Sequence, residues 1–191
     1  MTGADVRTLY ISTDIESDGP CPGKNSMLQL GSAVFDGKSE KHLGTFEVNL
    51  ELLPGASADL STVAFWKENA AAYARTRTNL KTPEDGMIEY AIWLKSLQAK
   101  LVFVGYPASF DSLFTFWYLH TFAGENPFGW QALDLKTLGM TLINKPFPMS
   151  TKRNYPTAWF GKAPHTHNGL DDAIEQGVMF TRMMAQTSIK L

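Results

Sequence analysis

Short apolar runs, bounded by glycine, proline or polar residues, predict that the chain begins with a sheet. Val6–Thr13 and Met27–Phe35 are the first two predicted strands. The pair Asp36-Gly37 is a hairpin signal that leads into a third strand over His42–Leu50. Because the connections are short, we expect these three strands to be antiparallel.

The rest of the chain alternates between helical periodicity and two short strands. The continuous apolar run Leu101–Val104 is typical of a strand covered on both faces, and Gln131–Leu135 predicts a fifth strand. The predicted helices are Ser61–Thr76, Pro83–Gln98, Asp111–Phe122, a segment that continues from the fifth strand to Asn144, and Gly169–Gln186. This order predicts an α/β fold in which a mixed five-stranded sheet is flanked by helices and ligands bind near the strand ends.

Composition agrees with one globular domain over residues 1–191. The chain is 44% hydrophobic and 19% charged, and its formal net charge of −2 argues against a protein that coats long duplexes through many phosphate contacts. A single cysteine, Cys21, excludes an intrachain disulfide and suits a reducing cytoplasm. We expect no signal peptide and no membrane-spanning segment.

Two acids stand at the end of the first predicted strand. Asp14 and Glu16 project to the same face of the strand, because alternate residues share a face. Carboxylates placed so close resist joint ionisation unless a cation lies between them, and Mg²⁺ and Mn²⁺ prefer carboxylate oxygen. The sequence therefore suggests a metal site, and the alternative is a solvated strand end.

A third acid, Asp111, follows the buried strand Leu101–Val104 at the start of a predicted helix. It is a candidate ligand. Acids also favour helix N-termini, so a capping role is the competing interpretation.

The last predicted helix offers two adjacent acids that point in different directions. If Asn168 is the N-cap, Asp171 serves the helix end and aligns with Glu175 and Arg182 on a solvent-facing strip. Asp172 turns toward the body of the protein and is the better ligand candidate. His167 lies in the entry loop, and an imidazole, with an ordinary pKa of about 6.5, can remove a proton at neutral pH. His165 is interpreted as a loop histidine.

Taken in order, these residues resemble the three motifs of the DEDDh group of DnaQ-like 3′–5′ exonucleases, which belong to the RNase H-like superfamily. The matching segments are Asp14-Ile15-Glu16, Phe110-Asp111 and His167-Asn168-Gly169-Leu170-Asp171-Asp172-Ala173. The resemblance spans about residues 8–185. Many relatives have asparagine four residues before the second-motif aspartate, where this chain has Pro107. The size of the chain and its Phe65-Trp66 pair resemble small exoribonucleases such as the RNase AS-like group.

The resemblance implies that Asp14, Glu16, Asp111 and Asp172 hold two divalent cations, Mg²⁺ or Mn²⁺, and that His167 is the general base. The five residues together would be catalytic. The partner implied is a single-stranded 3′ end of RNA or DNA, and the protein could pair as a homodimer. Contacts with the nucleic acid are predicted for Phe65, Trp66, Met27, Lys152, Arg153 and Lys162, with core packing or solvation as the alternative at each of these positions.

We expect a metal-dependent 3′–5′ exonuclease that releases nucleoside 5′-monophosphates, more readily from RNA than from DNA. One alternative is a DNA exonuclease of the proofreading or repair type with the same site. Another is a nucleic-acid-binding module that keeps the fold without catalysis, and a third is a phosphodiesterase acting on small dinucleotides.

Overall fold

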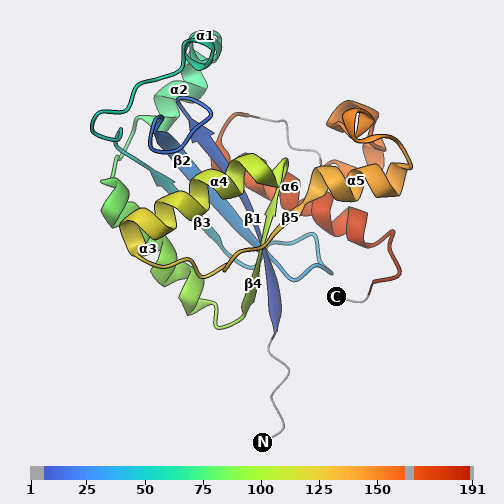
Figure 1. Cartoon of the computed structure of the whole chain (residues 1–191). Helices are drawn as coiled ribbons and strands as arrows, with labels where there is room; N and C mark the ends of the chain where they lie inside the picture. Colours follow the sequence, from blue (N-terminus) through green and yellow to red (C-terminus); the bar gives the residue numbers. More distant parts are fainter. Residues whose placement is uncertain (1–6, 162–165, 190–191) are drawn as a thin grey trace, which may run out of the picture.

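A computed structural model describes residues 7–161 and 166–189 of the chain. Its centre is a five-stranded sheet with the strand order β3-β2-β1-β4-β5 (Figure 1). The strands are β1 (Thr8–Ser17), β2 (Met27–Phe35), β3 (Thr45–Asn49), β4 (Lys100–Gly105) and β5 (Ala132–Asp134). The helices are α1 (Leu60–Glu68), α2 (Ala70–Thr76), α3 (Pro83–Ser96), α4 (Ala108–Tyr118), α5 (Leu135–Ile143) and α6 (Gly169–Met184).

The sheet is mixed. Strands β1, β2 and β3 pair antiparallel, whereas β4 pairs parallel to both β1 and β5. The predicted fold class, a mixed five-stranded sheet with three antiparallel strands first, is therefore confirmed. Parallel pairing carries the ends of β1 and β4 to the same edge of the sheet, where the first two acidic motifs lie.

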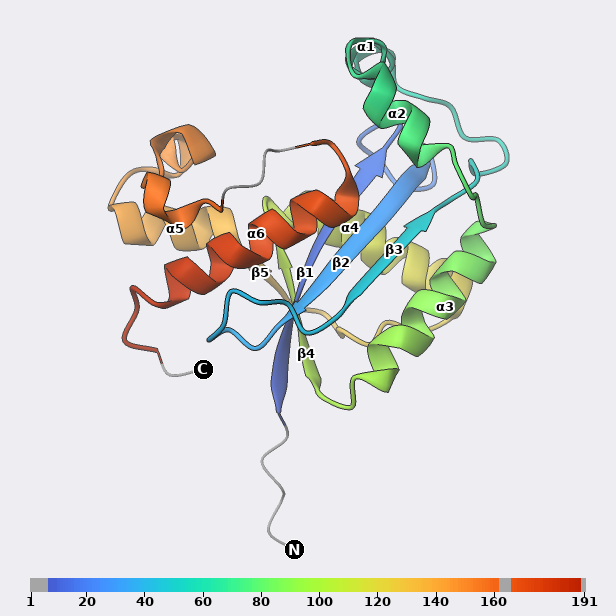
Figure 2. The same cartoon turned by 180° about the vertical axis from the view of Figure 1, so that it is seen from behind.

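Helices cover the two faces of the sheet. Helix α6 crosses β1 and β2 on one face, and α3 and α4 pack on the other (Figures 1 and 2). Strand β1 alternates between these layers: Leu9, Ile11 and Ile15 enter the main core, whereas Tyr10 packs in the cluster that includes α6. By the same alternation Asp14 and Glu16 face α6.

Several predicted elements differ from the observed ones. The first strand does not end at Thr13 but continues to Ser17, so that Asp14 and Glu16 lie within it. The predicted helix Ser61–Thr76 is two helices, because Asn69 leaves helical geometry with φ −112° and ψ 40°. The third strand begins at Thr45 rather than His42. Helix α4 begins at Ala108 and continues as a π-helical turn over Leu119–Ala123. Within the two described ranges, no helix combines the length and the apolar character needed to cross a membrane.

Candidate active site

Four acidic side chains from three elements meet beside the end of β1. Asp14 and Glu16 belong to β1, Asp111 to the first turn of α4, and Asp172 to the first turn of α6. The backbone amide of Ile15, between the two β1 acids, donates to Oδ1 of Asp111 at 3.4 Å. Hence the second motif lies directly against the first.

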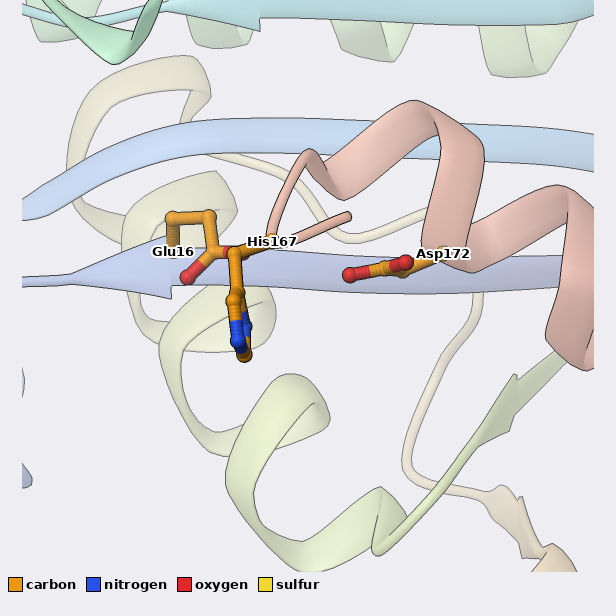
Figure 3. A group of neighbouring side chains, drawn as sticks. All are labelled: Glu16, His167 and Asp172. Carbon is orange, nitrogen blue, oxygen red and sulfur yellow. The ribbon is translucent and has the colours of Figure 1, made fainter. Parts of the chain in front are cut away.

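The third motif closes the group. One potential ligand atom from each of Glu16, His167 and Asp172 lies within 4.8 Å of the others (Figure 3). Figure 3 also shows that His167 comes from the loop before α6, whereas Asp172 comes from the helix itself. The sequence-predicted residues of the three motifs are thus brought together.

Burial and neighbouring negative charges raise the pKa values of these acids. Burial raises the pKa of Asp14 well above its usual value, and the charges of Asp111, Glu16 and Asp172 raise it further. Burial, followed by the charges of Asp172 and Asp111, raises the pKa of Glu16 to about 8. Burial raises the pKa of Asp111 to about 7. Without cations these carboxyl groups cannot all be ionised at neutral pH.

The donor set fits divalent cations. Oδ2 of Asp111 is buried, and no described residue forms a hydrogen bond with it. A buried carboxylate oxygen in this state costs free energy unless a ligand meets it. Asp14, Glu16, Asp111 and Asp172 supply only oxygen donors, which suit Mg²⁺ and Mn²⁺, and so these four residues would hold the ions.

The start of α6 explains why the two neighbouring acids differ. Asn168 is the N-cap, and its Oδ1 accepts a hydrogen bond from the amide of Asp171 at 3.0 Å. The side chain of Asp171 is exposed, whereas Asp172 is 3% exposed and accepts from the amide of Thr166 at 3.1 Å. The helix phase expected for these two acids is therefore observed.

Further along α6, the prediction that Glu175 faces solvent is wrong. This side chain is buried, and its Oε2 lies 2.8 Å from Nζ of Lys152. Lys152 begins a short 3-10 helix, Lys152–Asn154, in the segment between α5 and α6, and its charge also lowers the pKa of Asp14. A counter-charge from a distant segment thus permits an acid on the inner side of the helix.

Two glycines let α6 approach the sheet closely enough to deliver its acid. A Cβ atom at Gly31 of β2 would lie 2.1 Å from the amide nitrogen of Leu170. A Cβ atom at Gly169 would lie 3.1 Å from the carbonyl oxygen of Asp14. The amide of Gly169 donates to Oε1 of Gln29 at 2.7 Å. The first turn of α6 therefore rests on the backbone of β1 and β2.

The helix α4 that carries Asp111 has its own support. Oδ1 of Asp134, at the end of β5, accepts a hydrogen bond from the amide of Ala108 at 2.9 Å. Pro107 occupies the N-cap position and has no side chain that could cap the helix. Asp134 supplies that capping bond from a neighbouring strand.

A cavity of about 280 Å³ opens beside Glu16. It is close to the lower end of the range for small-molecule sites, about 300–1,000 Å³. Helix α1 contributes Phe65 and Trp66 to its wall, α4 contributes Phe110, and the loop after β1 contributes Pro20. Phe110 was not predicted as a contact, although its place beside Asp111 in the second motif is a signal for one.

His167 contacts Phe65, one of the residues that line this cavity. Its ring meets the ring of Phe65 edge-on, with centroids 5.0 Å apart and planes at 89°. Its backbone has φ of 51°, a left-handed conformation that is uncommon for residues other than glycine. His165 and Lys162 lie outside the described residues.

The remaining predicted nucleic-acid contacts divide into exposed and buried side chains. Phe65 is 38% exposed at the cavity, whereas Trp66 is 6% exposed and its Nε1 donates to the carbonyl of Ser17 at 2.9 Å. Trp66 thus also anchors α1 to the end of β1. Met27 is fully buried in the core, so the predicted contact of Met27 with a base is wrong. Lys152 is engaged with Glu175, and Arg153 is exposed.

Comparisons with known proteins find similarity in sequence and in fold. No protein-family model matches the chain. The 3′–5′ DNA exonuclease Cap18 of Escherichia coli is 26% identical over 178 residues, which cover 91% of this chain and 90% of that protein.

Solved structures share the fold. The nuclease domain of 3′hExo, a DEDDh family member bound to rAMP, has a TM-score of 0.69 at 10% identity and covers 96% of this chain and 94% of that one. The Mg²⁺ and Mn²⁺ bound form of S. pombe Pop2p has a TM-score of 0.62 at 12% identity, with 93% and 83% covered. The complex of E. coli ExoI with single-stranded DNA has a TM-score of 0.65 at 15% identity, and this chain spans 41% of it.

The chain therefore has the fold and the ordered motifs of the DEDDh 3′–5′ exonucleases. The resemblance inferred from its motifs is confirmed by sequence similarity to a 3′–5′ exonuclease and by a fold shared with a DEDDh family member.

Proposed function

We propose that this protein is a metal-dependent 3′–5′ exonuclease that releases nucleoside 5′-monophosphates from the single-stranded 3′ end of DNA. The observation that carries the proposal is the group of Asp14, Glu16, Asp111, Asp172 and His167, gathered from distant segments at a cavity beside Glu16. The name of the Cap18 relative, a DNA exonuclease that matches over most of both chains, favours DNA as the substrate.

The residues of the chain have separate tasks in this proposal. Phe65 and Phe110 bind the terminal base in the cavity beside Glu16, because aromatic rings stack on bases of any sequence. His167 accepts the proton of the attacking water at a ring nitrogen and so acts as general base, which is typically worth about 10²–10⁴ in rate. Asp14, Glu16, Asp111 and Asp172 hold the divalent ions. When bound, these ions supply positive charge that stabilises the phosphate in the transition state and promotes ionisation of the water.

RNA is the second candidate substrate. The preference for RNA expected from the sequence stays a prediction, and two structural neighbours favour it: one is bound to rAMP, and another recognises a histone mRNA stem-loop. Both substrates use the same carboxylates, and so the site chemistry does not separate them. Homodimer formation and a cytoplasmic location also stay predictions.

The experiment compares matched DNA and RNA oligonucleotides, labelled at the 5′ end, in Mn²⁺ or Mg²⁺. We expect stepwise shortening from the 3′ end with nucleoside 5′-monophosphate as the product, faster on DNA, and no product from D111N. Faster shortening of RNA would favour the second candidate. Tight binding of both oligonucleotides without product would favour a non-catalytic binding module, and hydrolysis confined to dinucleotides would favour a small phosphodiesterase.

A further inference from the structure

Arg75 connects the α1–α2 segment to the loop that carries His167. Its Nη2 donates a hydrogen bond of 2.7 Å to the carbonyl oxygen of Thr166, 91 residues away and immediately before His167. Arg75 lies in the last turn of α2, and that turn is fixed to the sheet. Nδ2 of Asn49 in β3 donates to the carbonyls of Arg75 at 3.0 Å and Thr78 at 2.8 Å. The guanidinium therefore extends from an anchored element.

The peptide before His167 is held from two sides. Arg75 binds its carbonyl at Thr166, and the amide of Thr166 donates to Oδ1 of Asp172 at 3.1 Å. His167 itself has the left-handed backbone and the edge-on contact with Phe65 described above. A non-glycine residue keeps such a backbone only where its surroundings fix it. Arg75 bonds the peptide directly before this residue.

We propose that Arg75 is a positioning residue that holds His167 in its productive place over the carboxylate group through the bond to Thr166. The proposal rests on the proposed function, in which His167 is the general base. A misplacement of about 1 Å in a catalytic group can cost about 10²-fold in rate, so one hydrogen bond to the adjacent peptide is enough to matter.

Arg75 also has a second effect that the test must separate. Its positive charge lowers the pKa of Glu16, opposing the larger effects of burial and neighbouring acids. Lysine at this position keeps the charge but has neither the reach nor the fork of donors of arginine. Lys67 on α1 provides the matched control: it is an exposed cation of the same segment, and no described residue of the histidine loop forms a hydrogen bond with it.

The first measurement is a double-mutant cycle at saturating Mn²⁺ with R75A, H167A and the double variant. We expect R75A to lower kcat by about 10- to 10²-fold with KM changed less than about threefold. In the H167A background the same change should cost less than about threefold, because there is no base left to position. R75K should recover part of the loss, and K67A should match the wild type. An equal loss in both backgrounds, or a change confined to KM, would overturn the proposal.

The second measurement does not depend on activity. Amide hydrogen exchange of peptides covering residues 166–172 should accelerate about tenfold in R75A, since a hydrogen bond from a charged group is lost. It should be unchanged in K67A. Unchanged exchange in R75A would refute the bond to Thr166 even if the protein proved to have no exonuclease activity. Faster exchange in an inactive protein would instead leave the contact standing and remove the proposed function.

Discussion

At the residue scale, the site depends on which of two adjacent aspartates points inward. Both lie in the first turn of α6, where acids favour the helix end. Asp171 stays exposed and accepts from Oγ1 of Thr166 at 3.1 Å, while Asp172 is buried among the other carboxylates. Two aspartates thus have different tasks, because successive side chains on a helix point about 100° apart.

This difference makes a matched pair of substitutions informative. D172N should lower kcat by more than about 10³-fold, since loss of an ion-holding carboxylate should cost more than a typical effect of a general base. D171N should change kcat less than about threefold, because an asparagine side chain still suits a solvent-exposed helix end. Steady-state kinetics at saturating Mn²⁺ measures both, and circular dichroism verifies that both variants fold. Equal damage from the two substitutions would contradict the helix phase.

Raised pKa values in the site give the metal-free protein a characteristic dependence on pH. Burial and neighbouring charges raise the pKa of Glu16 from 4.5 to about 8, and burial raises that of Asp111 from 3.8 to about 7. Over this window the folded protein binds more protons than the unfolded chain, so the free energy of unfolding falls as pH rises from about 4 to about 8. E16Q should flatten the fall, since its amide does not ionise.

Urea unfolding in EDTA at pH 5, 6, 7 and 8 measures this slope, and the difference between wild type and E16Q isolates Glu16. Saturating Mg²⁺ should raise stability most at the upper end of the range, because ions that bind only the folded state stabilise it. A slope that E16Q leaves unaltered would show that Glu16 is not held in the crowded, buried state described.

At the element scale, the decisive contact is the approach of α6 to β2. Gly31 and Gly169 remove side chains at the crossing, so the first turn of α6 lies on the strand backbones next to Asp14. A glycine inside a strand is commonly a place where another backbone comes close. The acid of the third motif reaches the acids of the first only through this contact.

Alanine at Gly31 tests that contact. Its methyl group would meet backbone atoms of Gly169 and Leu170 at 2.1–2.4 Å, and backbone cannot move aside as a side chain can. We expect G31A to lower the free energy of unfolding by about 1–3 kcal/mol or more and to reduce exonuclease activity as α6 is displaced. G44A is the control, because a Cβ atom there meets nothing within 4 Å and its effect should stay near about 0.5 kcal/mol. Thermal unfolding and exonuclease activity are measured for both variants. Equal stability of G31A and G44A would contradict the close contact between α6 and β2.

The elements also show what sequence patterns could and could not predict. Hydrophobic periodicity found the five strands, and the phase of Asp172 followed from placing the cap at Asn168. It missed the break at Asn69, where backbone angles rather than composition end α1. Periodicity also wrongly predicted that Glu175 is exposed to solvent. The pattern within one helix contains no information about Lys152, the counter-charge that a separate segment brings to Glu175.

At the scale of the whole molecule, the parallel pairing of β1 with β4 and the crossing of α6 over the sheet bring Asp14 and Asp172 together, although they are far apart in the sequence. The order of the motifs predicted which acids would meet, because the family that the motifs resemble has a fold that brings these positions together. The cavity wall was less predictable. Phe65 shares its helix with Trp66, and only the packing of α1 on the end of β1 decides that Trp66 is buried and Phe65 exposed. Likewise, the bond from Arg75 to Thr166 joins segments that no local pattern connects.

The central claim is that these distant acids form one site for divalent cations. Isothermal titration of Mn²⁺ into the metal-free protein tests it most directly, with D172N and D171N titrated in parallel. The wild type and D171N should bind Mn²⁺ with similar affinity, and D172N should bind at least about tenfold more weakly, the size seen even for groups that only support a ligand. Absence of binding to the wild type, or equal binding to D172N and D171N, would contradict the account.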